Sequence, residues 1–472
     1  MDKNNQVLLT DEQVQQFITD GFLILQTDFA PDFHESLMAQ LNKVYEEEGN
    51  PGNNLLPRIR ELQKVFDHPV ITGALTSVLG PDYMLHAHRH GHFNANPAAG
   101  GWHKDSYWGY DRMRNHHPWW AMIMYFPQDT PPELGPTGIM PGTQNYETRI
   151  FAKDDASGEA LASGGAGTFA LIHYDIWHRS TPNILGHPRY MLKFEFMRTE
   201  APAKPSWDAK GSAWSHPAGS AEGIPVHDRL WEESWNWLSG QLGSIAGSLP
   251  DEPSAVRGLA EKLEDAYEPD ALNAAYALAS AGEGGLQALL QALRHESTAV
   301  SRLAAYGLSV SGESAVPGLI AALDDARAAT VIHAAFALGE LRQLAAAAVS
   351  RLTALLVEAS AEVRRTVVEA LGMIGSGDPE AGAVQGLIQG LQDDDAQVRF
   401  MSGLALTRLG RSGEAAVPAL ERALDDENRY VRAHAAEALR YIGTPKAQDI
   451  LIRELFRSRW CATTTKENAF YP

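Results

Sequence analysis

The chain has 472 residues, which is too long for one ordinary hydrophobic core, so two or three domains are expected. With 44% hydrophobic and 21% charged residues, it has the composition of a soluble globular protein. The net charge of −20 is spread evenly, with 29 acidic and 18 basic residues before position 251 and 30 and 21 from position 251 onward. This predicts no basic face for nucleic acid or for an anionic membrane.

The only cysteine, Cys461, excludes disulfides within the chain and zinc sites built from thiolates. The opening residues, MDKNNQVLLTDEQVQQF, contain no apolar signal core. No run reaches the roughly 18 apolar residues of a membrane span. We therefore expect a cytoplasmic protein.

The first part of the chain is predicted to be rich in β-strands. LTDEQVQQFITDGFLIL, residues 9–25, predicts a helix that Thr10 caps and that runs into a strand. Between 83 and 198, strand-forming runs alternate with glycine and proline turns: YMLHAHRHGHFNANP, WWAMIMYFP, TGIMPGT, GTFALIHYDIWH and RYMLKFEFMR. This pattern predicts a double-stranded β-helix, a jelly-roll or cupin-like domain, over 1–200.

A linker and a docking helix are expected over 201–245. Residues 199–223 are dense in Pro, Ala, Gly and Ser, which is typical of a linker or long loop. DRLWEESWNWLSG, 228–240, then predicts a helix with Trp231, Trp235 and Leu238 on one face. We expect that face to join the two halves.

The second half repeats itself, which predicts an all-α solenoid over 246–458 with a tail at 459–472, so that the whole chain is α+β. Six segments of the type NAAYALASAG and TVVEALGMIG align, at spacings of 30 to 35 residues. Each unit contains two short apolar-striped helices that must stack to bury their stripes. Their shared leucines are Leu278, Leu308, Leu338, Leu371, Leu406 and Leu439. The pattern resembles short HEAT repeats, which implies a partner-binding surface or a purely structural extension.

Two H-x-D triplets, His103-Lys104-Asp105 and His173-Tyr174-Asp175, are candidates for a metal site. In a strand, residues i and i+2 project to the same face, so each triplet presents an imidazole beside a carboxylate. His178 has the wrong parity to join the second triplet, but it can reach the first from a neighbouring strand. We therefore favour His103, Asp105 and His178, a 2-His-1-carboxylate set that suits non-haem Fe(II).

The residues after His178 suggest a site for a dicarboxylate. Arg189 lies eleven residues further on, and its guanidinium offers a bidentate fork for a carboxylate. Ser180 can add a hydroxyl donor. Together they suit the far carboxylate of 2-oxoglutarate, whose 2-oxo acid end would chelate the iron.

With these motifs the first half resembles the phytanoyl-CoA dioxygenase family of Fe(II)/2-oxoglutarate oxygenases, over roughly 9–200. WHKD (102–105), GPTGIMPGTQ (135–144) and HRSTPN followed by Arg189 are similar to the family's motifs. The resemblance implies that His103, Asp105 and His178 bind iron and that Arg189, Ser180 and Asn94 contact 2-oxoglutarate. It implies an enzyme that uses Fe(II), 2-oxoglutarate and O₂.

The chain departs from the family pattern at two places, and one residue bears on the outcome of the reaction. Leu134 stands where the family has Asn, and PGTQ stands for P-G-S-H, which removes any role of that last histidine. Halogenating relatives replace the carboxylate ligand by a small residue. Asp105 therefore implies hydroxylation or a related oxidation, with release of succinate and CO₂.

Clues to the substrate are fewer. His86, His88, His90 and His92 share one strand face by parity; we expect His90 and His92 to line the pocket and the other two to meet solvent. In the segment 106–120, Tyr107, Trp108 and Arg112 are candidates for contact with the substrate. That this segment is only a packed or solvated loop without a role in binding is an equally supported alternative. We expect a small-molecule substrate, with a protein partner as a further possibility on the repeats.

Two other functions remain open from the sequence. The chain could be a HEAT-repeat scaffold with an inactive oxygenase-like domain, although the intact ligand set argues against it. It could also handle a chromophore, as repeat-containing lyases do, but Cys461 is a poor nucleophile for that role.

Overall fold

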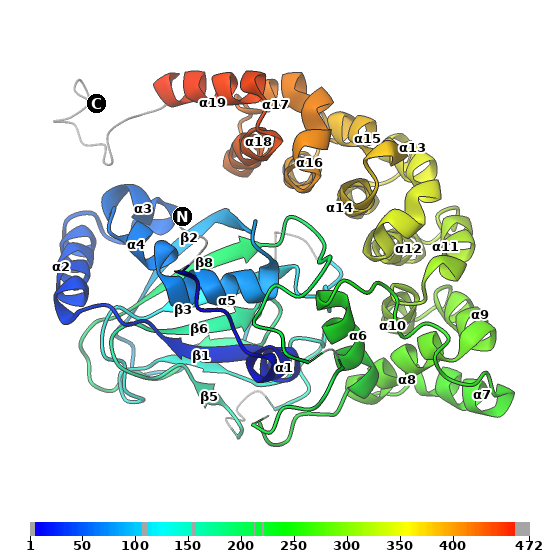
Figure 1. The fold of residues 1–472 in the computed structure, drawn as a ribbon, viewed down its shortest axis with the longest axis horizontal. Helices are drawn as coiled ribbons and strands as arrows, with labels where there is room; N and C mark the ends of the chain where they lie inside the picture. Colours follow the sequence, from blue (N-terminus) through cyan, green and yellow to red (C-terminus); the bar gives the residue numbers. More distant parts are fainter. Residues whose placement is uncertain (1–4, 106–111, 153–156, 212, 220, 458–472) are drawn as a thin grey trace.

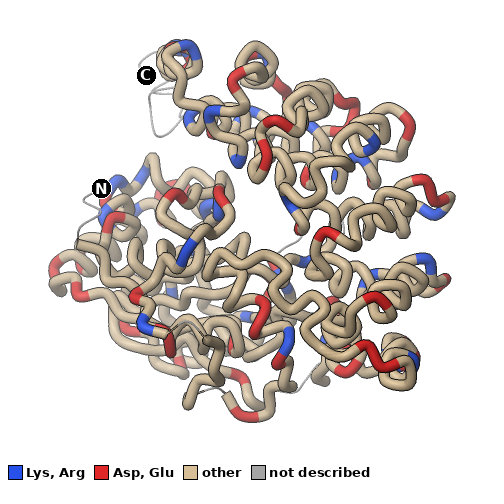
Figure 2. Tube along the Cα trace, turned by 45° about the vertical axis from the view of Figure 1, so that its right-hand side comes forward, with Lys and Arg blue, Asp and Glu red and all other residues tan. Residues whose placement is uncertain are grey.

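The computed structural model describes residues 5–105, 112–152, 157–211, 213–219 and 221–457. Figure 1 shows a β-sheet domain, flanked by helices, inside an arc of paired helices formed by the second half of the chain. Basic and acidic residues are scattered over both parts (Figure 2), as their even spread along the sequence predicts.

The first domain begins with the predicted helix and strand. In α1 (Asp11–Asp20), the Thr10 side chain accepts from the amide of Gln13, whose own side chain accepts from the Thr10 amide, forming a capping box. Gly21, at φ 80°, ends the helix and leads into β1 (Phe22–Gln26). Four further helices follow: α2 (Pro31–Glu48), α3 (Leu55–Arg58), α4 (Leu62–Asp67) and α5 (Pro69–Leu79), with a 3₁₀ turn η2 (Gly52–Asn54) before α3.

Two antiparallel sheets follow, as the strand pattern predicts. The larger sheet has the order β1-β6-β3-β8-β2 and the smaller has the order β5-β4-β7. The bounds are β2 Met84–Asn94, β3 Trp120–Tyr125, β4 Thr137–Ile139, β5 Ala160–Leu161, β6 Thr168–His173, β7 His178–Ser180 and β8 Arg189–Met197. The expected oxygenase-like β domain is confirmed.

Strand β8 has two different faces because side chains alternate along it. Phe194 and Phe196 pack on Phe66 of α4, in the apolar core between the large sheet and the helices. The opposite face carries Arg189, Met191, Lys193 and Glu195 in turn. This polar face is directed into the space that contains the candidate site.

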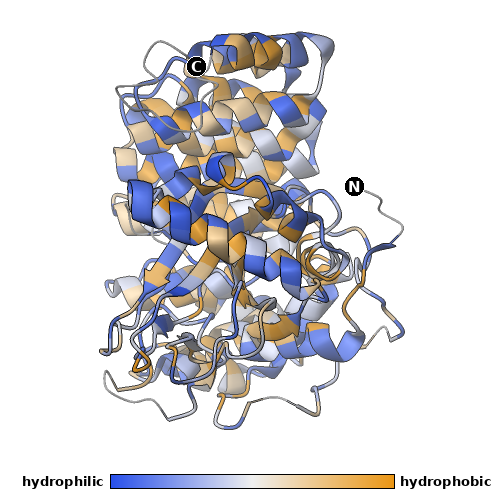
Figure 3. Cartoon of the chain, turned by 90° about the vertical axis from the view of Figure 1, so that its left-hand side faces the viewer, coloured by the Kyte–Doolittle hydropathy of each residue, from blue (hydrophilic) through white to orange (hydrophobic). Residues whose placement is uncertain are grey.

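The second half is the predicted solenoid of helix pairs. Its helices are α7 (Pro253–Lys262), α8 (Glu268–Ser280), α9 (Gly282–Ala292), α10 (Thr298–Leu308), α11 (Val316–Ala322), α12 (Ala328–Leu341), α13 (Val349–Glu358), α14 (Ala361–Gly377), α15 (Ala383–Gly390), α16 (Ala396–Leu409), α17 (Val417–Ala423), α18 (Arg429–Ile442) and α19 (Pro445–Arg457). The six aligned leucines are all buried, one in each of the even-numbered helices from α8 to α18. These helices carry mixed polar and apolar surfaces (Figure 3). None of the helices in the described ranges is long and apolar enough to cross a membrane.

The region between the two halves packs closely and is not a free linker. Trp207 is buried and donates from Nε1 to Asp11 Oδ1 of α1 (2.6 Å). Helix α6 (Asp228–Leu238) contacts both α1 of the first domain and α8 of the solenoid. Trp231 and Trp235 are buried, and their rings lie against aromatic side chains of the connecting region, among them Trp214.

The inner helices of the solenoid contact the first domain along the whole arc. At one end, Glu268 of α8 accepts from the amides of Glu147 and Thr148 (2.8 Å each). At the other end, the Tyr441 hydroxyl of α18 donates to the carbonyl of Tyr83 (3.1 Å). The inner face of the solenoid is therefore already in contact with this chain's own first domain.

Residues 112–119, which lead into β3, lie at the centre of this contact. Glu340 of α12 accepts from Asn115 Nδ2 (2.7 Å), His117 Nδ1 (2.8 Å) and Trp119 Nε1 (3.3 Å). His116 Nδ1 lies 2.8 Å from the Tyr276 hydroxyl of α8. A buried carboxylate with three donors thus fixes the chain just before it enters β3.

One expectation about exposure was wrong. His86 does not meet solvent: it is 2% exposed, and its Nε2 lies 3.3 Å from Nε2 of His434 in α18. The parity argument treated β2 as part of an isolated sheet, and the solenoid covers this end of the strand. A register shift between Leu85 and Arg89 also breaks the regular alternation there.

Candidate metal centre

His103, Asp105 and His178 form the one group of three potential metal ligands found in the part of the chain that the structure describes. One ligand atom from each lies within 4.8 Å of the others. His178 is the first residue of β7, and His103 pairs with it across an isolated antiparallel bridge. Asp105 lies two residues after His103, and its Oδ2 is 3.0 Å from His178 Nε2.

Backbone carbonyls orient both imidazoles. His103 Nδ1 donates to the carbonyl of Gly101 (2.9 Å), and His178 Nδ1 donates to that of Ile176 (3.1 Å). The Nε2 atom of each ring faces Asp105, at 4.0 Å for His103 and 3.0 Å for His178. Because Nδ1 of each ring is held by a carbonyl, Nε2 is the atom left to coordinate a metal, so the donor set fits a divalent ion.

The other residues of the two triplets lie elsewhere. Lys104 points away from the site, where its Nζ donates to the carbonyls of Thr143 and Tyr146. Asp175 is buried and pairs with Arg114 (3.1 Å). His173 and Asp175 are absent from the ligand group, as the parity argument predicts.

Lys193 of β8 is a neighbour of this group that the sequence analysis did not single out. Its Nζ lies 2.9 Å from Asp105 Oδ2, and its side chain is 5% exposed. Burial acts to raise the pKa of Asp105, but His178 and Lys193 outweigh it and hold the pKa well below its usual value. The sequence could have indicated Lys193, because every second residue of a strand lies on the same face and Lys193 is four residues after Arg189 in RYMLKFEFMR.

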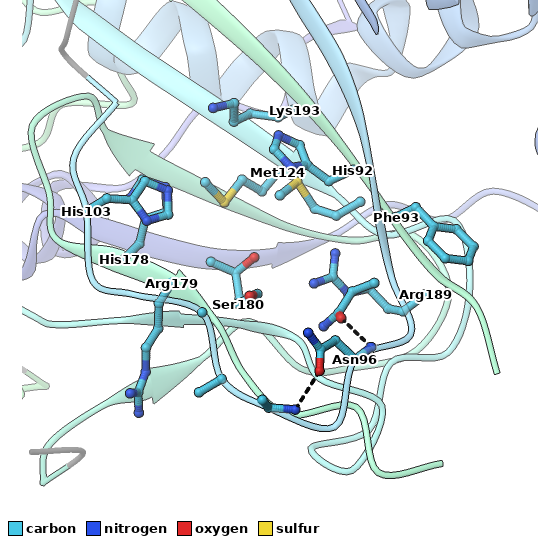
Figure 4. Close-up of a pocket in the computed structure, with 16 residues that line it drawn as sticks. His92, Phe93, Asn96, His103, Met124, His178, Arg179, Ser180, Arg189 and Lys193 are labelled. Atoms are coloured by element: carbon cyan, nitrogen blue, oxygen red, sulfur yellow. Dashed lines mark hydrogen bonds between the residues drawn. The ribbon is translucent and has the colours of Figure 1, made fainter. Parts of the chain in front are cut away.

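A cavity of about 320 Å³ adjoins the ligand group, and Figure 4 shows the residues around it. His103, His178, Ser180, Arg189 and Lys193 all line it. Arg189 is 2% exposed; its Nε donates to the carbonyl of Gly135 (2.9 Å), while its Nη1 has no hydrogen-bond partner. A buried guanidinium with a free N–H inside a cavity fits an anionic group.

Asn94 also lines the cavity, but its amide is tied to the main chain. Its Nδ2 donates to the carbonyl of Thr181 (3.2 Å), and its Oδ1 accepts from the amide of Asn96 (2.9 Å). The side chain therefore shapes the loop beside Arg189.

The structure separates the expected substrate residues. His92 lines the cavity, whereas His90 lies opposite Lys193 in the sheet and does not line it. Arg112 pairs with Glu369 of α14, so it serves the domain contact and does not line this cavity. Tyr107 and Trp108 lie outside the described residues.

Gln144, which departs from the family pattern, has a structural role. Its Nε2 donates to the carbonyls of Ile18 (3.0 Å) and Thr19 (3.3 Å) at the end of α1. The residue is buried and holds the first helix against the loop after β4.

A family model described as phytanoyl-CoA dioxygenase (PhyH) matches residues 9–191, which hold all of the proposed ligands. The first domain is a phytanoyl-CoA dioxygenase domain. This family comprises Fe(II)/2-oxoglutarate-dependent oxygenases, and the His103-Asp105-His178 group, which could hold a metal ion, lies within the matched residues. A HEAT-repeat model matches residues 316–384 and 384–459, so HEAT repeats follow the phytanoyl-CoA dioxygenase domain.

No curated protein matches the chain. Among solved structures, it is similar to HygX from Streptomyces hygroscopicus with nickel and 2-oxoglutarate bound. The identity is 13% and the TM-score is 0.34, and the match covers 45% of this chain and 95% of that chain. It is similar to EctD from S. alaskensis at 16% identity and a TM-score of 0.35, and the match covers 47% of this chain and 88% of that chain. The non-heme carbocyclase SnoK from nogalamycin biosynthesis gives 16% identity, 43% and 94% coverage and a TM-score of 0.34.

Proposed function

We propose that the chain is an Fe(II)/2-oxoglutarate-dependent dioxygenase that hydroxylates a small metabolite. The observation that carries the proposal is the ligand group His103, Asp105 and His178 beside a cavity that contains the unpaired Nη1 of Arg189. Two imidazoles and a carboxylate leave three positions free on a six-coordinate metal, which is the arrangement of non-haem iron oxygenases.

The metal ligands are proposed to act as a preset clamp. His103 and His178 would each present Nε2, and Asp105 would supply the only charge among the three protein ligands. When bound, the iron would couple decarboxylation of 2-oxoglutarate to O₂ activation, so that one oxygen atom ends in succinate and the other in the hydroxylated substrate, with CO₂ released.

Arg189 and Ser180 are proposed to hold 2-oxoglutarate. The Nε of Arg189 is fixed by Gly135, which leaves its Nη1 free to donate to the far carboxylate. Ser180 lines the same cavity and would add a hydroxyl donor. Met124 and Met191 give the cavity an apolar wall that would keep water from the reacting groups.

Lys193 is proposed to neutralise Asp105 until a metal arrives. In the structure its ammonium faces the carboxylate that would bind the ion. Because a dication and an ammonium compete for the same carboxylate oxygen, Lys193 would turn away or weaken metal binding. His92 is half-buried, keeps a buried and unpaired Nε2, and is a candidate for contact with the substrate.

The alternative, a scaffold with an inactive oxygenase-like domain, has less support. A scaffold needs a free surface for its partner, and the inner helices of this solenoid contact the first domain from α8 to α18. We therefore propose that a protein partner, if there is one, binds outside that inner face.

The test is a spectrum of the full-length protein. Under anaerobic conditions with Fe(II), addition of 2-oxoglutarate should produce a weak visible charge-transfer band. Asp105→Ala is the control and should give no band. A folded wild-type protein that holds iron but shows no band would rule the proposal out. Succinate release with a panel of small metabolites would then identify the substrate.

A further inference from the structure

A second cavity, of about 680 Å³, lies at the seam between the two domains. One wall is the chain that follows β8, residues 199–203, and the other is formed by the ends of α12, α14 and α16. Arginine and hydroxyl side chains dominate the solenoid wall: Arg342, Arg408, Arg411, Ser376, Thr407 and Ser412. Asp82 and Glu200 lie on the first-domain side.

Arg342 has a backbone conformation that one other repeat gives to glycine. Its φ of 54° and ψ of −128° make it the only non-glycine residue with positive φ among those described. Two repeats later, Gly410 follows α16 in the same way, with φ 52° and ψ −132°. A side chain in this region strains the backbone, and glycine would avoid that strain. The strain indicates that the arginine side chain itself is needed there.

The Arg342 guanidinium is buried and only partly satisfied. It is 3% exposed; Nη2 donates to Ser376 Oγ (3.1 Å), and the group lies 5.2 Å from the ring of Trp119. Its Nε and Nη1 have no hydrogen-bond partner. Unpaired donors on a buried cation are costly, so an acceptor is expected beside them.

Neighbouring charges leave this region positive. Arg408 lies 4.6 Å from the same Trp119 ring and donates from Nη1 to the carbonyl of Arg198 (3.1 Å). Burial, with repulsion from Arg342 and Arg408, lowers the pKa of Arg198 to about 9. Both oxygens of the nearby Glu340 are already taken by Asn115, His117 and Trp119. Glu369, which also lies near Arg408, is paired with Arg112. Both carboxylates near these buried arginines are therefore already engaged.

We propose that this cavity, the seam site, binds the phosphate group of a small molecule through Arg342 and Arg408. Two guanidinium groups and the hydroxyls of Ser376, Thr407 and Ser412 match a group with three acceptor oxygens. The cavity is larger than a single ion needs, which leaves room for the molecule that carries the phosphate. Since its walls come from both domains, binding there holds the domains together.

The experiment measures thermal unfolding of the full-length protein in inorganic phosphate, against chloride at equal ionic strength. A ligand that binds only the folded state raises the midpoint with concentration. We expect phosphate to raise the melting temperature by about 2 °C or more, and equilibrium dialysis to find one phosphate per chain. Glycerol 3-phosphate in a second arm should bind more tightly than inorganic phosphate if the site takes an organic phosphate.

Arg342→Gly is the informative variant because glycine relieves the backbone strain while removing the guanidinium. It should melt at or above the wild-type temperature in chloride and should lose the phosphate response. Arg408→Met, in which the backbone is unaltered, should lose it as well. Arg189→Met should keep it, which separates this site from the candidate metal centre and its cavity.

Two results would overturn the proposal. One is a wild-type protein whose melting temperature does not respond to either phosphate compound. The other is a response that survives in both Arg342→Gly and Arg408→Met. If the arginines only balance the carbonyl ends of the helices, Arg342→Gly should melt lower in every salt and the wild type should show no phosphate response.

Discussion

His103 and His178 are joined through their backbones: each amide donates to the carbonyl of the other at 3.0 Å. Their rings lie 4.4 Å apart as a result. Two imidazoles from segments 75 residues apart are therefore brought into register by main-chain bonds, which no metal is needed to form. This pairing makes the ligand group a feature of the fold, and the first prediction tests it.

Asp105→Ala should weaken metal binding strongly and stop turnover, because it removes the only carboxylate from the group. Asp175→Ala should leave a metal bound, since Asp175 pairs with Arg114 and not with the group. Its effect on metal affinity should therefore be smaller than the about 10–100-fold loss that is typical for a residue hydrogen-bonded to a metal ligand. Titration with Co(II), followed by its visible spectrum, measures both variants. The opposite order would mean that the metal binds around residues 173–178.

Arg189→Met should raise the 2-oxoglutarate concentration needed for half-maximal turnover by at least about tenfold. The variant removes a buried charge-assisted donor, which is worth about 1.5–3 kcal/mol. Affinity for the metal alone should stay close to that of the wild type, because Arg189 contacts no ligand. Equal loss of metal and cosubstrate binding would instead show that the fold had been damaged.

Lys193→Met should bind divalent metal about tenfold more tightly than the wild type, because a cation 2.9 Å from Asp105 Oδ2 no longer competes for it. Lys193→Arg keeps the charge and is the matched control. Isothermal titration with Zn(II) gives the affinities. A weaker affinity in Lys193→Met would show that the ammonium helps to assemble the site.

Acidification should destabilise the protein between pH 6.5 and about 4. Burial lowers the pKa of eleven described histidines, so the folded state resists their protonation while the unfolded state accepts it near pH 6.5. The pKa falls to about 3 in His86, His92 and His116 and to about 4 in His173 and His333. Their contribution to stability is complete above pH 6.5 and is lost as the pH falls.

Glu195 works in the opposite direction, since burial raises its pKa to about 7. Burial also raises the pKa of Asp20, Glu233 and Glu437, but these are four groups against eleven histidines. Each histidine that is completely buried should cost about 2 kcal/mol at pH 5. Denaturant unfolding at pH 7.5, 6 and 5 measures the loss. His116→Gln cannot be protonated and should lessen it; a stability that is flat over this range would contradict the prediction.

Glu340→Ala should lower the free energy of unfolding by about 3 kcal/mol or more. The change leaves buried donors of Asn115, His117 and Trp119 without an acceptor, at about 1–3 kcal/mol each. Glu362→Ala, at an exposed position of α14, is the control and should change stability by less than about 0.5 kcal/mol. Similar losses in both would mean that the domain contact does not depend on Glu340.

Local patterns in the sequence accounted for most of the fold. The Thr10 cap, the strand alternation around β3 and β8 and the repeated leucines each depend on near neighbours in the chain, so their spacing was informative. The choice of His103-Lys104-Asp105 over the second triplet also followed from strand parity and agrees with the ligand group.

The contacts between the domains could not be predicted in this way. The partners of Arg112 and His86 lie more than 250 residues away, at Glu369 and His434, and no periodicity links such positions. Lys193 was missed for a different reason: attention to the motif around His178 ended at Arg189, although the same strand continued into the site.

The contacts at the two ends of the arc, Glu268 with residues 147–148 and Tyr441 with Tyr83, fix the number of repeats. Solenoids that bind external partners can gain or lose a unit and still present a usable surface. Here an added or deleted repeat would displace Tyr441 by roughly the spacing of packed helices, about 10 Å. Every helix after the changed repeat would then lose its present contacts with the first domain. Repeat proteins commonly evolve by duplicating a repeat. In this chain such a duplication would disrupt the domain contacts unless the enclosed domain changed as well.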